Sequence, residues 1–291
     1  MKIPHYTELG ATLFIPASHK NLEAILLDSK YKGLKSLLID TEDGLDEKDY
    51  ESSLGTIAKL LPELIEQKLY IFIRPRDTQT LKTLLSFKDI EKIDGFILPK
   101  FSLTNAKEYL KLLENSEHCI MPSIEGSELF HQQELLELRD LLLTNKQKIV
   151  LVRFGLEDML RQLGLRRSCE ESVFDFAAIN ATLGNFIALF KSAGFAVSGG
   201  VYPCFDDLSG FVKDVKRDMR EGLFSKTIIH PKQIDIVNTL YQVTKEEFDE
   251  AQKIINSNEN IFSLNAKMAE RTTMLPYSLE ILKRAKVYGL R

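Results

Sequence analysis

The sequence lacks the features that mark several common classes of protein. Its 291 residues contain no apolar run of the roughly 18 residues that a membrane span needs, and Met1 to His5 carry no signal-peptide core. Neither a GxGxxG nor a GxxxxGKS/T phosphate loop is present, which disfavours nucleotide-binding domains of those types. Lys and Arg are scattered and the net charge is −4, so nucleic-acid binding has no support. We expect a soluble cytoplasmic protein.

Cysteine is also scarce. The three cysteines, Cys119, Cys169 and Cys204, are far apart, odd in number and without CxxC spacing. This pattern predicts neither a disulfide framework nor a zinc site, and a reducing compartment is the expectation. Each cysteine is expected to be a small buried side chain rather than a nucleophile.

What the sequence does contain is a series of short apolar runs that end on charged residues. They occupy residues 37–43, 71–74, 97–100, 121–125 and 149–153. Runs of about 4–8 apolar residues predict strands buried on both faces, and their alternation with helical stretches predicts βα units in a parallel sheet. An apolar content of 44% is enough for a globular core.

The strands and helices expected from these patterns fit one large barrel. Strands are predicted over 12–15, 37–40, 69–73, 95–98, 119–124, 148–153, 196–201 and 227–229. Helices are predicted over 20–31, 46–67, 106–113, 128–143, 156–162, 173–192 and 208–221. Eight strands and a length of this order predict a TIM (β/α)8 barrel over residues 1–243. A C-terminal helical extension with a polar break at 256–260 is predicted over residues 244–291.

Acids at two neighbouring strand ends form the sharpest candidate metal site. Glu125 ends the fifth predicted strand, and Asp158 follows the sixth by a turn that contains Gly155. The C-terminal ends of barrel strands meet at one rim, where two carboxylates with water and substrate oxygens would hold Mg2+. The alternative is that Glu125 caps a helix and Asp158 is a first-turn acid.

A basic residue ends the third predicted strand. Arg74 can clamp a substrate carboxylate in a bidentate fork, while Asp40 and Glu42 at the end of the second strand would orient it or position water. The alternative is that Arg74 makes a structural salt bridge to Glu42 or Glu125.

Three further basic residues are candidates for substrate binding: Arg76, Lys100 and His230. Lys100 could act as a Schiff-base lysine, but a charge-balancing role beside the acidic rim is the alternative. His230 ends the last strand, where a phosphate or base role and a helix-start hydrogen bond are both open. Asp206 and Asp207 are expected to cap a helix.

Several segments together resemble the citrate lyase beta-subunit-like family of the HpcH/HpaI aldolase group. The resemblance runs through most of the chain and is carried by residues 13–17, 39–43, 73–74, 98–100, 124–125, 154–159 with 163–164, and 222–234. Their order and spacing are more specific than any one of them.

The resemblance implies a TIM barrel that binds Mg2+ through Glu125 and Asp158, with Arg74 on the carboxylate of an oxo or hydroxy acid. The implied reaction is reversible carbon–carbon cleavage through a metal-stabilised enolate, on the acid or its CoA thioester. The family's habit implies a homo-oligomer, either a trimer or a multiple of one.

The chain departs from the family pattern at several positions. Gly10-Ala11 stands where an Arg-Ser pair is frequent, which leaves CoA use open. Arg76 replaces an Asn, Ser225 replaces a Gly, and the segment around Glu270 lacks the family's C-terminal Asp. We therefore identify a divergent member, with two rival hypotheses: a barrel enzyme acting on a phosphorylated or nucleotide-linked substrate within a multi-enzyme pathway, and a non-catalytic assembly subunit.

Overall fold

The computed structural model describes residues 3–65 and 68–291. The chain divides into two compact units, the first ending at Ile234 and the second covering Asp235–Arg291. Within the described residues, no helix combines the length and the apolar character that crossing a membrane requires.

The first unit is built on a parallel sheet whose strands follow one another in space as they do in sequence. Its order is β6-β5-β4-β3-β2-β1-β7. The strands are β1 (Ala11–Pro16), β2 (Ser36–Asp40), β3 (Tyr70–Arg74), β4 (Gly95–Leu98), β5 (Cys119–Ile124), β6 (Arg153–Phe154) and β7 (Lys226–Ile228). Six of the predicted strands thus lie within about one residue of their predicted positions, as expected for strands covered on both faces. The strand predicted over 148–153 is instead reduced to β6 and isolated bridges at Ile149 and Val152.

Residues 197–199 close this sheet into a ring. Val197 bridges to Val152 and Gly199 bridges to Lys226, both in parallel. The strand predicted over 196–201 is therefore reduced to two isolated bridges. Gly199 and Gly200 provide no side chains to pack, which weakens a regular strand here.

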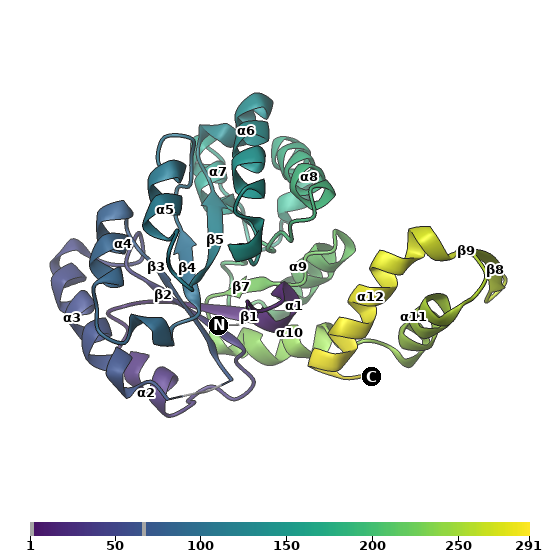
Figure 1. Cartoon of the computed structure of the whole chain (residues 1–291), viewed down its shortest axis with the longest axis horizontal. Helices are drawn as coiled ribbons and strands as arrows, with labels where there is room; N and C mark the ends of the chain where they lie inside the picture. The colour runs from purple at the N-terminus through teal and green to yellow at the C-terminus, as the bar shows by residue number, and fades with distance from the viewer. Residues whose placement is uncertain (1–2, 66–67) are drawn as a thin grey trace. The chain divides into compact units, whose positions relative to one another are not determined.

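Helices cover the outside of the sheet, as Figure 1 shows for α3 to α6. The helices of this unit are α1 (Tyr6–Leu9), α2 (Leu22–Leu27), α3 (Tyr50–Leu60), α4 (Thr78–Leu85), α5 (Ala106–Leu112), α6 (Gln132–Leu143), α7 (Leu156–Gln162), α8 (Ala177–Ser192) and α9 (Leu208–Arg220). The helix predicted over 46–67 corresponds to the shorter α3, and residues 66 and 67 lie outside the described residues.

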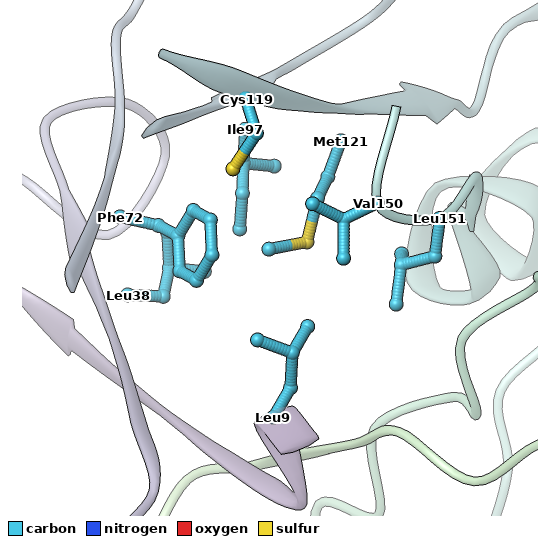
Figure 2. Packing of buried hydrophobic residues seen from close by; sticks show 8 residues of the cluster. All are labelled: Leu9, Leu38, Phe72, Ile97, Cys119, Met121, Val150 and Leu151. Carbon is cyan, nitrogen blue, oxygen red and sulfur yellow. The ribbon is translucent and has the colours of Figure 1, made fainter. Parts of the chain in front are cut away.

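Apolar side chains fill the interior of the barrel. Leu38, Phe72 and Met121 belong to one buried cluster, together with Leu9, Ile97, Cys119, Val150 and Leu151 (Figure 2). Successive strand residues point to opposite faces, so the residue two positions later faces the same interior. That rule places Asp40, Arg74 and Ser123 above this apolar layer, towards the C-terminal ends of the strands.

A disulfide joins two loops of the first unit. Cys169 and Cys204, 35 positions apart, are bonded with a Cα–Cα distance of 5.7 Å, whereas Cys119 is free and buried. The prediction of no disulfide is therefore wrong for Cys169 and Cys204. Their proximity arises because the loop after α7 and the loop after residues 197–199 come from neighbouring strand positions, which the spacing along the sequence does not reveal.

The second unit holds two long helices and a hairpin. It contains most of α10 (Ile234–Leu240), then α11 (Lys245–Asn256), β8 (Ile261–Leu264), β9 (Lys267–Glu270) and α12 (Arg271–Tyr288). The prediction of a helical segment with a polar break missed this hairpin. Its turn, Asn265-Ala266, has positive φ at both residues, 51° and 58°, but lacks the glycine that marks such turns in a sequence.

Candidate active site

Arg74, at the end of β3, lies against two acids that follow from β2. Its Nε donates to Asp40 Oδ1 at 2.5 Å, and its Nη1 lies 3.1 Å from Glu42 Oε2. The guanidinium also lies 5.2 Å from the centre of the Phe14 ring. Burial disfavours the charge of Arg74, but Asp40 and Glu42 outweigh burial and raise its pKa above the ordinary value. The structure thus fixes Arg74 by the acids predicted to orient it.

Asp40 is itself held in place by the chain that follows it. It is fully buried, and its oxygens accept hydrogen bonds from the main-chain nitrogens of Glu42 at 3.2 Å and Gly44 at 2.8 Å. These main-chain donors hold the Asp40 carboxylate in a fixed position, and the guanidinium of Arg74 bonds to it there.

Lys100 balances the acids of the same rim. Its Nζ lies 2.6 Å from Glu42 Oε1 and 3.0 Å from Asp43 Oδ1. Burial raises the pKa of Glu42, while Arg74 and Lys100 oppose that rise. These contacts favour the charge-balancing interpretation of Lys100, because its amine is already paired.

Glu125 follows β5 and is buried. Its Oε1 accepts from the main-chain nitrogen of Lys100 at 2.6 Å, and its Oε2 accepts from Ser123 Oγ at 2.9 Å. Burial raises the pKa of Glu125 and the nearby charge of Glu42 adds to this, against the two hydrogen bonds. A buried carboxylate with two fixed donors and free lone pairs is suited to receive a cation.

The turn after β6 brings α7 against Glu125. A Cβ added to Gly155 would lie 2.0 Å from the Cβ of Glu125, so only glycine fits this contact. Gln162 Nε2 donates to the main-chain oxygen of Glu125 at 2.7 Å and to that of Asp158 at 3.3 Å. The backbones that carry the two predicted metal ligands are therefore linked, while the Asp158 carboxylate pairs with Arg161 at 2.7 Å.

Arg153, which was assigned no role from the sequence, also lies in the barrel mouth. It pairs in register with Ser123, while the next residue, Phe154, packs against Phe186 of α8 outside the sheet. Arg153 therefore faces inward, where its Nη2 donates to Thr227 Oγ1 at 2.8 Å. Burial and the charge of Arg74 lower the pKa of Arg153 to about 10, against the attraction of Glu125.

A bulge sets this orientation. Ile149 bridges to Ile120 and Arg153 pairs with Ser123, so four steps along one segment match three steps along β5. One extra residue in a strand redirects the side chains that follow it. The only feature of the sequence that pointed to Arg153 was its position as the charged residue at the end of the apolar run 149–153.

Arg76 and His230 lie with other partners. Arg76 pairs with Glu47 at 2.7 Å and lies over the Tyr50 ring at 4.0 Å. His230 begins a short 3-10 helix, accepts from the main-chain nitrogen of Lys232 at 3.2 Å and stacks on Phe205. No contact among the described residues joins either side chain to the ion-paired cluster of Asp40, Glu42, Arg74 and Lys100.

The capping prediction is confirmed for Asp207, which caps α9 through the main-chain nitrogen of Gly210 at 2.9 Å. Asp206 instead pairs with Lys232 at 2.7 Å.

The acidic donors fit Mg2+ as a partly hydrated ion. Within residues 3–65 and 68–291, no group of three or more His, Cys, Asp or Glu could enclose a metal. Mg2+ is commonly bound through one or two carboxylates, with the remaining ligands from water and substrate. Glu125 and Asp158 would supply these carboxylates if Asp158 exchanged its exposed partner Arg161, and exposed pairs of this kind are weak.

The first unit is a closed parallel barrel, and its ion-paired acids and bases lie at the C-terminal ends of the strands. This arrangement is that of a TIM barrel with its candidate site at the C-terminal rim. Residues 3–290 match the family described as C-C bond lyase of the TIM-barrel fold. The chain belongs to this family, and the predictions of the fold class and of a lyase family of the citrate lyase beta type are confirmed.

Curated relatives agree with this assignment. The chain is 24% identical over 294 residues to citrate lyase subunit beta of Haemophilus influenzae, covering 94% of this chain and 96% of that protein. In the Escherichia coli K12 citrate lyase subunit beta, 28% identity extends over 152 residues, 50% of this chain and 48% of that protein. A (3S)-malyl-CoA thioesterase of Cereibacter sphaeroides is 22% identical over 249 residues, 84% of this chain and 81% of that protein. Such low identities fit a divergent member.

Solved structures share the fold. A citrate lyase from Burkholderia xenovorans LB400 superposes with a TM-score of 0.77 at 17% identity, covering 97% of this chain and 93% of the other. The CitE protein of Mycobacterium tuberculosis in complex with magnesium, acetoacetate and coenzyme A gives 0.69 at 17% identity, covering 95% and 98%.

Proposed function

We propose that the chain is a Mg2+-dependent lyase that cleaves or forms a carbon–carbon bond in a small oxo or hydroxy acid or its CoA thioester. The observation that carries the proposal is the linked set at the rim: Arg74 fixed by Asp40 and Glu42, and Glu125 fixed by Lys100 and Ser123. Family membership supports the reaction type.

The residues of the rim match the charge changes of this reaction. Breaking a carbon–carbon bond beside a carbonyl builds negative charge on an enolate oxygen, which preorganised positive charge stabilises. Mg2+ bound by Glu125 and Asp158 would supply a Lewis acid for that charge. Arg74 would hold the carboxylate of the substrate, with Asp40 and Glu42 keeping its guanidinium from rotating.

Structures of related proteins provide further support for the metal. The Mycobacterium tuberculosis CitE protein is described with magnesium and acetate, and as a complex with oxaloacetate and magnesium. We extend this metal and this class of small carboxylate to the present chain.

CoA use rests on one unusual position. Gly10 precedes β1 with φ 57° and ψ −122°, a region that glycine adopts and other residues essentially avoid. Gly10 stands where an arginine is frequent in the family, and an arginine with the same backbone would be strained. This chain would therefore have to hold a CoA group differently. Thermal shift with CoA, with a small oxo acid and with inorganic phosphate tests this point together with the phosphorylated-substrate alternative.

Calorimetric titration with Mg2+ tests the proposal. Glu125→Gln keeps an oxygen that can accept from Lys100 but removes the charge, so Mg2+ affinity should fall at least about 10-fold. Asp158→Asn should also weaken binding. Glu137→Gln on the exposed face of α6 is the matched control and should bind as the wild type does. Equal affinity in wild type and Glu125→Gln would contradict the proposal.

The family's habit motivates a proposal for the assembly state. We propose a homo-oligomer, a trimer or a multiple of one, which size-exclusion chromatography with light scattering measures directly. A monomer at all concentrations tested would contradict it.

A further inference from the structure

The charges in the barrel mouth are unequally paired. Arg74 is engaged by Asp40 and Glu42, and Lys100 by Glu42 and Asp43. Arg153 differs, because its described hydrogen bond is to a neutral acceptor, the hydroxyl of Thr227. Over the part of the chain that the structure describes, no ion pair joins Arg153 to a carboxylate.

An unpaired guanidinium in this position is costly. Arg153 faces the interior in register with Ser123, and Arg74 adds a like charge nearby. Removing a charge from water without a partner disfavours it strongly. Glu125 attracts Arg153 but is bonded to Lys100 and Ser123. A second negative group held in the mouth would offset this cost.

We propose that Arg153, with the Thr227 hydroxyl beside it, binds a second carboxylate of the substrate and so selects dicarboxylic over monocarboxylic oxo acids. This proposal rests on the proposed function, and it adds a specificity residue to that site. A guanidinium presents five donors in a planar fork that matches a carboxylate, and Thr227 takes only one of them.

The surroundings favour a small planar anion at this place. Ser123 and Arg153 are paired neighbours at the ends of β5 and β6, and Thr227 lies on β7. The site is thus built on strands, which hold side chains more tightly than loops do. Arg74 would then take the first carboxylate, close to Glu125, and Arg153 the second.

Oxaloacetate and pyruvate provide a matched pair of probes, because they differ by one carboxylate. We expect the wild type with Mg2+ to bind oxaloacetate more tightly than pyruvate by about 10- to 100-fold, as a charge-assisted fork should provide. In Arg153→Met, oxaloacetate affinity should fall to the pyruvate level while pyruvate affinity stays within about 3-fold. Calorimetry with each acid measures both values.

Two further variants keep the test decisive. Arg153→Lys retains the charge but loses the fork, so it should keep part of the preference and fold even if Arg153→Met does not. Arg139→Met, on α6, makes the same change outside the barrel and should leave both affinities unchanged. Circular dichroism melting establishes which variants are folded.

The possible outcomes separate the two proposals. A wild type that binds Mg2+ and both acids, but without preference for oxaloacetate, overturns the role of Arg153 alone. So does an equal loss of both acids in Arg153→Lys. A wild type that binds no Mg2+ overturns the proposed function, whereas the preference for oxaloacetate measured without metal still decides the role of Arg153. Competition by inorganic phosphate in wild type but not in Arg153→Met would show a phosphate site instead.

Discussion

The main-chain nitrogen of Lys100 lies 2.6 Å from Glu125 Oε1, and Lys100 reaches this position with a left-handed φ of 46°. A non-glycine residue in that region costs roughly 1–2 kcal/mol. The strain places an N–H donor on the carboxylate proposed to bind the metal, while the Lys100 amine pairs with Glu42 and Asp43. One residue therefore serves two acids through two different groups.

Replacing Lys100 separates these two contributions. Lys100→Gly keeps the N–H donor and relieves the strain, so Mg2+ affinity should stay within about 3-fold of wild type. Loss of the amine leaves Glu42 with Arg74 as its cationic partner, so the pKa of Glu42 should rise further above its ordinary value. The measurements are Mg2+ calorimetry and the pH profile of kcat/KM, whose acidic limb should move to higher pH. An unchanged limb would contradict this role for Glu42.

The contact between Gly155 and Glu125 should be intolerant of a methyl group. Gly155→Ala places its Cβ against the backbone and Cβ of Glu125, and overpacking of this kind typically costs about 1–3 kcal/mol. We expect that loss in urea unfolding, together with weaker Mg2+ binding. Gly184→Ala, in α8 with open space around it, is the control and should raise stability by about 0.5–1 kcal/mol. Equal effects of the two variants would contradict the prediction.

Asp94 should make the fold less stable as the pH rises. Burial raises the pKa of Asp94 to about 6, against a hydrogen bond from the main-chain nitrogen of Ile71. The folded state then binds more protons than the unfolded state between about pH 4 and 6. The contribution of Asp94 to stability is therefore present below pH 4 and is lost as the pH rises through about 6.

Asp94→Asn tests this dependence, because the amide oxygen can still accept from Ile71. Between pH 4 and pH 7 the variant should gain about 1–2 kcal/mol relative to wild type, after allowance for partial exposure. Urea unfolding at the two pH values measures the difference. A constant difference between the two proteins would show that Asp94 titrates normally.

The disulfide should be detectable by counting thiols. Denatured without reductant, the chain should show one reactive thiol, Cys119, and after reduction it should show three. Closing a loop with a sequence separation of 35 stabilises a fold by about 2–4 kcal/mol, so Cys169→Ser with Cys204→Ser should lower stability by that amount. Three thiols in the freshly purified, unreduced chain would contradict the bond.

A buried charge network should hold α9 against the sheet. Lys226, fully buried in β7, lies 2.5 Å from Asp214 Oδ2 and 2.6 Å from Asp218 Oδ2. Lys226→Met would leave two buried carboxylates without their shared partner, which typically costs about 3–5 kcal/mol. Changing Lys226 and Asp218 together to apolar residues should cost less than Lys226→Met alone, because Asp214 then keeps Arg167 as its partner at 3.5 Å. Thermal and urea unfolding compare the two variants, and a larger loss in the double variant would contradict this account.

The strands were predictable where apolar runs had clear limits. Residues 95–98 and 119–124 form β4 and β5 as predicted, because both are buried on two faces and are bounded by polar or turn residues. The charged residues at the ends of β2, β3 and β4 come together in one ion-paired cluster that contains Asp40, Glu42, Arg74 and Lys100. Parallel topology alone brings such ends together.

Other features depend on contacts that spacing along the sequence cannot show. The partners of Arg76 and His230, which are Glu47 and Phe205, come from other segments of the chain. The β8–β9 hairpin turns at Asn265-Ala266 without a glycine. Arg153 points inward only because of a one-residue shift between the segment 149–153 and β5, and periodicity does not reveal a shift of that kind.

That shift has a consequence for how the family could change its preference for substrates. Were this segment paired regularly from Ile149, without the bulge, Val152 would lie opposite Ser123 and Arg153 opposite Ile124. The guanidinium would then turn towards α8 and the Phe154 ring towards the cavity. A pocket that recognises a doubly charged acid would then be exchanged for an apolar one without any substitution. Selectivity at this rim is thus encoded partly in the register of main-chain pairing, and related barrels without the bulge need not share it even where every catalytic side chain is the same.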